Sequence, residues 1–182
     1  PAQPLAFSTA QTAVCQSTSN VTYTVPAVAG ASSYTWSYSG SGATITGTSN
    51  TVSVSYNSTA TSGTLSVSAV NGCGTGSTRS LAITVTPTPI ATFSYPGDPY
   101  CENEVNPTPV FSGGGVARIF SSTAGLVFVS TATGEIDLIA STPGTYTVTN
   151  TIAAYGGCSV VTATSSVTIY ALSTWTAGNN ST

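Results

Sequence analysis

The chain has 182 residues, enough for two small domains, and only 4% of them are charged, against about 25% in an ordinary globular protein. Its two cations, Arg79 and Arg118, cannot neutralise a phosphate track, which excludes nucleic acid as a partner. No apolar run approaches the ~20 residues of a membrane-spanning helix, so we expect no membrane insertion. Without His or Lys, catalytic triads and general-base chemistry are excluded, and we expect no enzyme activity and no cofactor.

Apolar and hydroxyl side chains alternate along most of the chain. Residues 51–56, 64–69 and 145–149 each place apolar side chains on one face and Ser or Thr on the other, which predicts half-buried strands. Gly, Ser, Asn and Pro interrupt this pattern every 8–12 residues or so. The pattern predicts an all-β protein built from antiparallel β-sandwiches of about seven strands each, without a helix.

The sequence repeats itself with a period of about 86 residues, the size of a small domain. A Phe-Ser pair precedes Cys15 and another precedes Cys101 by the same distance, and Cys73 and Cys158 follow these cysteines at nearly equal spacing. Paired cysteines indicate an oxidising compartment. Of the three ways to pair four cysteines, the repeat favours Cys15–Cys73 and Cys101–Cys158, one disulfide in each module.

A Thr-Pro-Thr-Pro segment at residues 86–89 marks the boundary between the modules, because Pro does not continue a central strand and favours a stiff, extended chain. We therefore predict a first sandwich at residues 1–87 and a second at 88–171. Residues 172–182 form a tail or the start of a further module. Because the chain begins at Pro1, we expect a processed product or a segment of a longer protein.

Two sets of motifs resemble a known family. The first half carries VCQ at 14–16, VTYTVP at 21–26, SYTW at 33–36 and NGCGTG at 71–76. The second half carries Cys101, NPTP at 106–109, FSGGG at 111–115 and STPGTYTV at 141–148. Together they resemble the PKD-like, immunoglobulin-like tandem repeats of large Bacteroidetes cell-surface proteins of the gliding or adhesin type. The resemblance implies a secreted, extracellular cell-surface protein exported by the type IX route, with no catalytic residues to carry over.

Three aromatic side chains, Tyr34, Trp36 and Tyr38, share one face of a predicted strand. The favoured interpretation places Trp36 in the core, packed against a disulfide, as in immunoglobulin-like sandwiches. The alternative is an exposed aromatic platform that stacks on sugar rings, which would make this a glycan- or host-surface-binding module. Outside the predicted modules, Trp175 is a candidate for contact with a neighbouring module or subunit, and Phe7 is a second candidate.

The few carboxylates are interpreted as ordinary surface groups. Glu135 and Asp137 share a strand face, where the favoured interpretation is solvated carboxylates near Arg118. The alternative for the acidic residues around Cys101 is a Ca²⁺ site, but we predict no metal site; these residues are Asp98, Glu102 and Glu104.

The scarcity of charge favours a structural role. Sheet edges are normally guarded by charged side chains, whereas the first 97 residues here contain one, Arg79. With a net charge of −3, neighbouring copies approach without strong repulsion. We therefore predict a stiff, disulfide-reinforced rod that builds an extracellular filament or giant adhesin, with other copies or neighbouring modules as partners.

Overall fold

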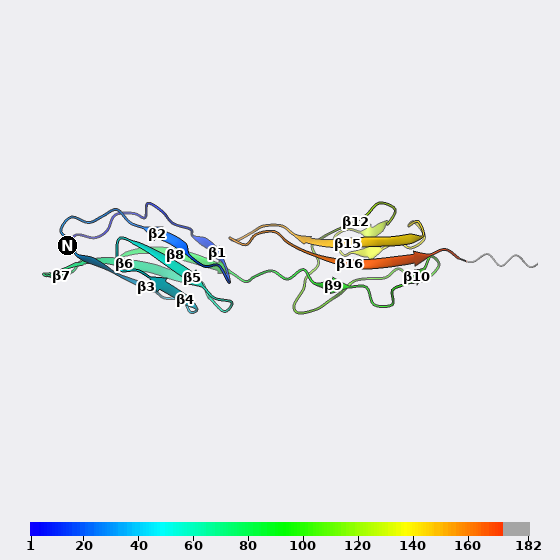
Figure 1. The fold of residues 1–182 in the computed structure, drawn as a ribbon, viewed down its shortest axis with the longest axis horizontal. Coiled ribbons are helices and arrows are strands. Elements are labelled where there is room, and N and C mark those ends of the chain that lie inside the picture. Colours follow the sequence, from blue (N-terminus) through cyan, green and yellow to red (C-terminus); the bar gives the residue numbers. More distant parts are fainter. Residues whose placement is uncertain (173–182) are drawn as a thin grey trace, which may run out of the picture. The chain divides into compact units, whose positions relative to one another are not determined.

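The computed structural model describes residues 1–172 as sixteen β-strands without a helix (Figure 1), so the prediction of an all-β fold is confirmed. No helix in this part of the chain could therefore cross a membrane. The chain divides into two compact units. The first contains Pro1–Thr88 together with Ala154–Ser159, and the second contains Pro89–Ala153 and the chain from Val160 onward.

The first unit is a sandwich of two sheets. Its larger sheet has the order β1-β8-β6-β3, with β7 paired to β6; the strands are β1 (Ala13–Cys15), β3 (Ser33–Tyr38), β6 (Gly63–Asn71), β7 (Gly74–Thr75) and β8 (Arg79–Thr86). Its smaller sheet has the order β2-β5-β4; the strands are β2 (Val21–Thr24), β4 (Ala43–Thr46) and β5 (Thr51–Tyr56). Alternate residues of both sheets point inward and form one apolar core.

This core is built from the alternation that the sequence displays. On β5, Val52, Val54 and Tyr56 are buried while the intervening Ser and Thr face outward. The hydroxyls of Tyr23 and Tyr56 lie 3.0 Å apart inside the core, and the Tyr23 hydroxyl also donates to the carbonyl oxygen of Gln11. Burial raises the pKa of both tyrosines, because an apolar core disfavours the charged phenolate.

The second unit has a four-stranded sheet of order β10-β16-β15-β12; the strands are β10 (Tyr100–Cys101), β12 (Ile119–Ser122), β15 (Gly144–Ile152) and β16 (Val161–Tyr170). Two strand pairs complete it: β9 (Phe93–Ser94) with β11 (Val110–Phe111), and β13 (Phe128–Ser130) with β14 (Glu135–Ile136). An aromatic core links these sheets, with Phe93 and Phe120 meeting edge to face at 5.2 Å. Asn150, which is fully buried, fixes the start of the unit by donating to the carbonyl oxygens of Ala91 and Val116.

The sequence led us to expect antiparallel pairing throughout, but each unit contains one parallel pair of strands. In the first unit β1 lies parallel to β8, and in the second β10 lies parallel to β16. In both units the first strand of this sheet lies along its edge, beside the last strand and in the same direction. Alternation within a strand does not reveal the direction of its partner, so the sequence pattern could not show this.

The predicted disulfide pairing is wrong. The structure contains one disulfide, Cys15–Cys158, which closes a sequence separation of 143 residues, whereas Cys73 and Cys101 are unbridged in the described part of the chain. Cys15 pairs with Thr86 at the end of β8, whereas Cys73 lies beyond the far end of β6. The length of β6 alone, nine residues at about 3.3 Å each, places the two cysteines far outside the Cα separation of up to ~7 Å that a disulfide tolerates.

The same geometry separates the second predicted pair. Cys101 pairs with Tyr170 at the end of β16, and Cys158 lies before the beginning of that ten-residue strand. Each pair of cysteines that the repeat suggested as partners therefore lies at opposite ends of a long β-hairpin.

Candidate functional site: the disulfide seat

The candidate functional site is the place where the Cys158 loop contacts the end of β1. We call Cys15 with residues 86–88 the Cys15 seat, and residues 154–159 the Cys158 tip. The backbone N–H of Gln16 donates to the carbonyl oxygen of Thr86 at 2.9 Å, and the Thr18 N–H closes a turn onto the carbonyl oxygen of Cys15. These bonds continue the parallel pairing of β1 with β8 and hold the Cys15 sulfur at the edge of the sheet.

The Cys158 tip is a tight hairpin turn. Tyr155 and Cys158 exchange both backbone hydrogen bonds, at 3.1 and 2.8 Å, and enclose Gly156 and Gly157. Both glycines have positive φ, 55° and 85°, as a type I′ turn requires of its two central residues. The Gly-Gly pair therefore allows a turn narrow enough to bring its backbone against another strand.

Close backbone approach is the second reason for these glycines. A Cβ at Gly157 would lie 2.5 Å from the carbonyl oxygen of Ala13 and 2.6 Å from Cα of Val14. A Cβ at Gly156 would overlap the side-chain oxygen of Thr86. The main chain of the tip therefore packs against the main chain of β1 and against the Thr86 side chain of β8.

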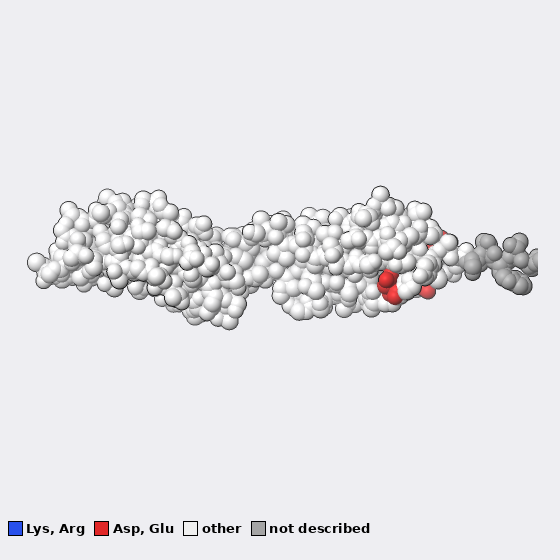
Figure 2. All heavy atoms as spheres, viewed as in Figure 1, with Lys and Arg blue, Asp and Glu red and all other residues white. Residues whose placement is uncertain are grey.

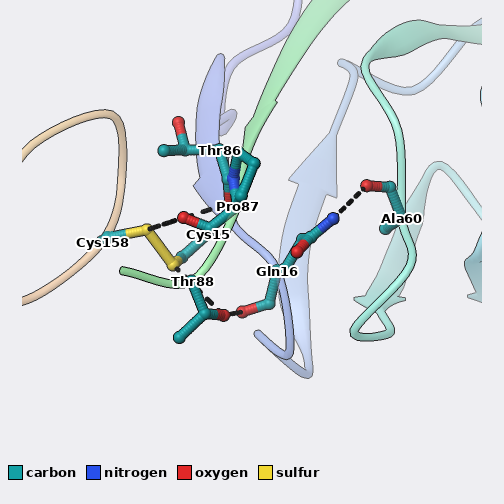
Figure 3. Close-up of a disulfide and its surroundings, with 7 residues drawn as sticks. All are labelled: Cys15, Gln16, Ala60, Thr86, Pro87, Thr88 and Cys158. Carbon is teal, nitrogen blue, oxygen red and sulfur yellow. Dashed lines mark hydrogen bonds between the residues drawn. A yellow bond between two sulfur atoms is a disulfide. The ribbon is translucent and has the colours of Figure 1, made fainter. Parts of the chain in front are cut away.

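The disulfide is enclosed by these contacts (Figure 3). Cys15 and Cys158 are only 9% and 4% exposed, and the Cys158 sulfur lies 3.7 Å from the carbonyl oxygen of Pro87. On the other side the Thr88 hydroxyl donates to the Gln16 carbonyl oxygen at 3.2 Å, and the Gln16 side chain donates to that of Ala60. A shielded disulfide is a structural cross-link rather than a reactive one.

The predicted aromatic face is engaged with its own unit. Trp36 and Tyr38 are half-buried and pack on the core. The Trp36 indole N–H donates to the carbonyl oxygen of Ser49 at 2.9 Å, and the Tyr38 hydroxyl donates to that of Thr61 at 2.8 Å. Both rings are therefore held to their own unit by packing and by one hydrogen bond each. The sequence suggested that Trp36 packs against a disulfide. Instead its ring packs against that of Phe7, with the ring centroids 6.0 Å apart.

Tyr34 differs from the other two aromatic residues. It lines an open hollow of about 310 Å³, with residues 27–28, 31–33 and 48–50. Its hydroxyl accepts a hydrogen bond from the backbone N–H of Val28 at 2.7 Å, so the ring braces this loop. The hollow has no charged lining residue, and its chemistry does not select a ligand class.

Two aromatic residues were predicted to contact a neighbouring module or subunit. Phe7, which is half-buried, packs against the core of its own unit through Trp36. Trp175 lies outside the described residues.

The carboxylates act mainly as acceptors for the backbone. Asp98 accepts a hydrogen bond from the N–H of Thr168, Glu102 from that of Leu172 at 3.2 Å, and Asp137 from that of Ala140 at 3.1 Å. Within residues 1–172, no three His, Cys, Asp or Glu side chains are grouped as a metal site requires. In the view of Figure 2, acidic atoms are visible only over the second unit.

The four cysteines stand out in the sequence, but the residues that determine their pairing do not. Thr86 and Pro87 were interpreted as a linker, and Gly156 and Gly157 as an ordinary turn. The signal that could have found them is the Gly-Gly pair directly before Cys158. Such a pair permits a close backbone approach that the turn alone does not need.

Comparison with known proteins agrees with this architecture. Residues 1–83 match the family model of the PKD-like domain. This part of the chain has the PKD-like, immunoglobulin-like fold. No curated protein sequence matches the chain.

Solved structures that match the chain include the D00-D0 domain of intimin, at 12% identity and a TM-score of 0.44, covering 91% of this chain and 98% of that one. Human mucin-like protocadherin EC1-2 matches at 11% identity and a TM-score of 0.38, over 92% and 98% of the two chains. A SusE-like surface-located polysaccharide-binding protein of Bacteroides thetaiotaomicron matches at 13% identity and a TM-score of 0.32, over 85% and 32%. These TM-scores lie below 0.5, and no functional conclusion rests on them.

Proposed function

We propose that this chain is a non-enzymatic structural segment of an extracellular filament or large cell-surface adhesin. In this proposal two tandem immunoglobulin-like sandwiches form one stiff link. The partners are other copies of the chain or neighbouring modules of the same polypeptide. A secreted surface protein of Bacteroidetes is the setting that the sequence motifs favour.

One observation carries the proposal: the Cys158 tip folds with the first unit although its flanking strands, β15 and β16, belong to the second. The chain therefore connects the two units both at Thr88–Pro89 and through the tip, which a shielded disulfide fastens to Cys15. A single flexible linker would leave domain motion as the default. A second, covalently closed connection restricts that motion, as a link under tension requires.

The low charge of the chain supports the same role. Only Arg79 is charged among the side chains of residues 1–97. Copies of such a surface meet without the repulsion that keeps ordinary soluble proteins apart.

Electron microscopy of the native material tests the proposal. We expect regular filaments or fibres with a repeat that accommodates this pair of units. A dilute, monodisperse population of compact single molecules would contradict it. Small-angle scattering gives a second test with a matched control. The oxidised chain should show a narrower distribution of dimensions than its Cys15→Ala/Cys158→Ala variant, whereas Cys73→Ala/Cys101→Ala should not differ from the parent.

A further inference from the structure

The second unit contains a copy of the Cys15 seat. Cys101 pairs with Tyr170 on the last strand, as Cys15 pairs with Thr86. The N–H of Glu102 donates to the Tyr170 carbonyl oxygen at 3.1 Å, and the N–H of Glu104 closes a turn onto the Cys101 carbonyl oxygen at 3.0 Å. Each of these hydrogen bonds has its counterpart around Cys15. We call Cys101 with Glu102, Tyr170 and Leu172 the Cys101 seat.

Unlike the Cys15 seat, this one is uncovered by the described residues. Cys101 is unbridged and only partly buried. Beside it Ile139, Tyr170 and Leu172 are 82%, 55% and 47% exposed. They adjoin a hollow of about 430 Å³ that is lined by Glu102, Asn103, Ile139 and Leu172. In the first unit the corresponding place is filled by a hairpin tip that carries a cysteine.

The first unit contains such a tip as well, and it is exposed among the described residues. Cys73 is exposed at the turn between β6 and β7, and no atom lies within 4 Å of a Cβ built on Gly72 or Gly74. Gly74 has a φ of 128°, which accounts for its glycine, but Gly72 has no positive φ. Nothing inside the described chain therefore requires glycine at position 72. At the Cys158 tip, glycine beside the cysteine has a clear purpose, which is close approach to a neighbouring strand.

Charge favours a meeting of this tip with the Cys101 seat. The seat region carries three of the chain's five carboxylates, those of Asp98, Glu102 and Glu104. The first 97 residues contain no carboxylate, and their one charged side chain is that of Arg79 on β8. Two tips or two seats lack this complementarity, and two seats repel each other.

We propose that Cys101 of one copy of this chain forms a disulfide with Cys73 of a second copy, with the β6–β7 tip of the second copy covering the Cys101 seat of the first. The arrangement repeats the Cys15–Cys158 junction between molecules and joins them head to tail. A heterologous contact of this kind propagates into a linear polymer unless it closes into a ring. The inference deepens the proposed structural role, on which it rests.

The chemistry is a thiol–disulfide exchange. The Cys73 and Cys101 thiols together lose two protons and two electrons as the new S–S bond forms. An oxidised disulfide compound or a disulfide-carrying oxidoreductase of the oxidising compartment accepts them and is released as two thiols.

The test uses two full-length variants, each with one free cysteine. Cys101→Ser leaves Cys73 as its unbridged cysteine, and Cys73→Ser leaves Cys101. They are incubated with oxidised glutathione, separately and as an equal mixture. Trypsin cleaves after Arg79 and Arg118, so mass spectrometry of the unreduced peptides shows which cysteines are joined.

We expect the Cys73–Cys101 dimer of the mixture to exceed each self-dimer by at least about tenfold, because specific docking raises the effective concentration of the two thiols. Random collision predicts an excess of only about twofold, and that ratio, or the absence of dimers, would overturn the inference.

A second pair of variants checks the seat. Ile139→Glu in the Cys73→Ser chain should slow the cross-link about fivefold or more, whereas Val129→Glu, at an exposed apolar position that does not line the hollow, should not. Equal rates for the two would also count against the docking. Filaments in native material without this cross-link would refute the inference and leave the structural role standing.

Discussion

Removing the Cys15–Cys158 disulfide should cost the protein a large share of its stability. The bridge closes a sequence separation of 143 residues, and the chain-entropy model assigns a loop of this length about 5 kcal/mol. Measured losses for native disulfides are typically 2–5 kcal/mol, so we expect the Cys15→Ala/Cys158→Ala variant to lose about 3–5 kcal/mol of unfolding free energy. Alanine is the appropriate replacement because both positions are buried, where a serine hydroxyl would lack a partner.

The assay is guanidinium unfolding of the oxidised proteins, followed by circular dichroism. The matched control, Cys73→Ala/Cys101→Ala, removes the two cysteines that are unbridged and should change the free energy of unfolding by less than about 0.5 kcal/mol. A reductant should lower the parent to the level of the first variant and abolish the difference between them. An equal loss in both variants, or no loss in the first, would show that the Cys15–Cys158 bridge does not stabilise the fold.

Three further predictions concern the rest of the structure. Gly157→Ala should destabilise the oxidised chain by about 1–3 kcal/mol in denaturant melts, because its Cβ meets the backbone of β1, whereas Gly72→Ala should be nearly neutral in the monomer. Burial raises the pKa of Tyr56 above its ordinary value of 10.0. The contribution of Tyr56 to stability should therefore be fully present below pH 10. Above pH 10 only unfolded chains ionise this group, so the free energy of unfolding should fall by up to about 1.4 kcal/mol per pH unit. Tyr56→Phe should reduce that slope. Asn150→Ala should cost about 2–4 kcal/mol in urea melts, because it strands the buried carbonyls of Ala91 and Val116, whereas the exposed Asn103→Ala should cost little.

The sequence was sufficient to predict an all-β fold and part of the core of the first unit. The alternation of residues 51–56 placed Val52, Val54 and Tyr56 on the buried face, where the structure has them. This signal is local, because side chains of a strand alternate between its two faces whatever the strand pairs with.

The cysteine pairing could not be predicted from the sequence, because it depends on which ends of the hairpins meet. The repeat related Cys15 to Cys101 and Cys73 to Cys158 but did not show that β6 separates Cys15 from Cys73. Nor could it show that the Cys158 tip folds with the other unit. Trp36 was expected beside a disulfide by analogy with immunoglobulin-like sandwiches, and it packs against Phe7 instead.

Disulfide mapping of the oxidised native chain tests whether Cys15 is joined to Cys158. Trypsin divides the chain into residues 1–79, 80–118 and 119–182, which carry Cys15 with Cys73, then Cys101, then Cys158. The structure predicts that the first and third peptides stay joined until a reductant is added, through Cys15 and Cys158. A first peptide that is released with an internal bridge, and a second that remains attached to the third, would contradict it.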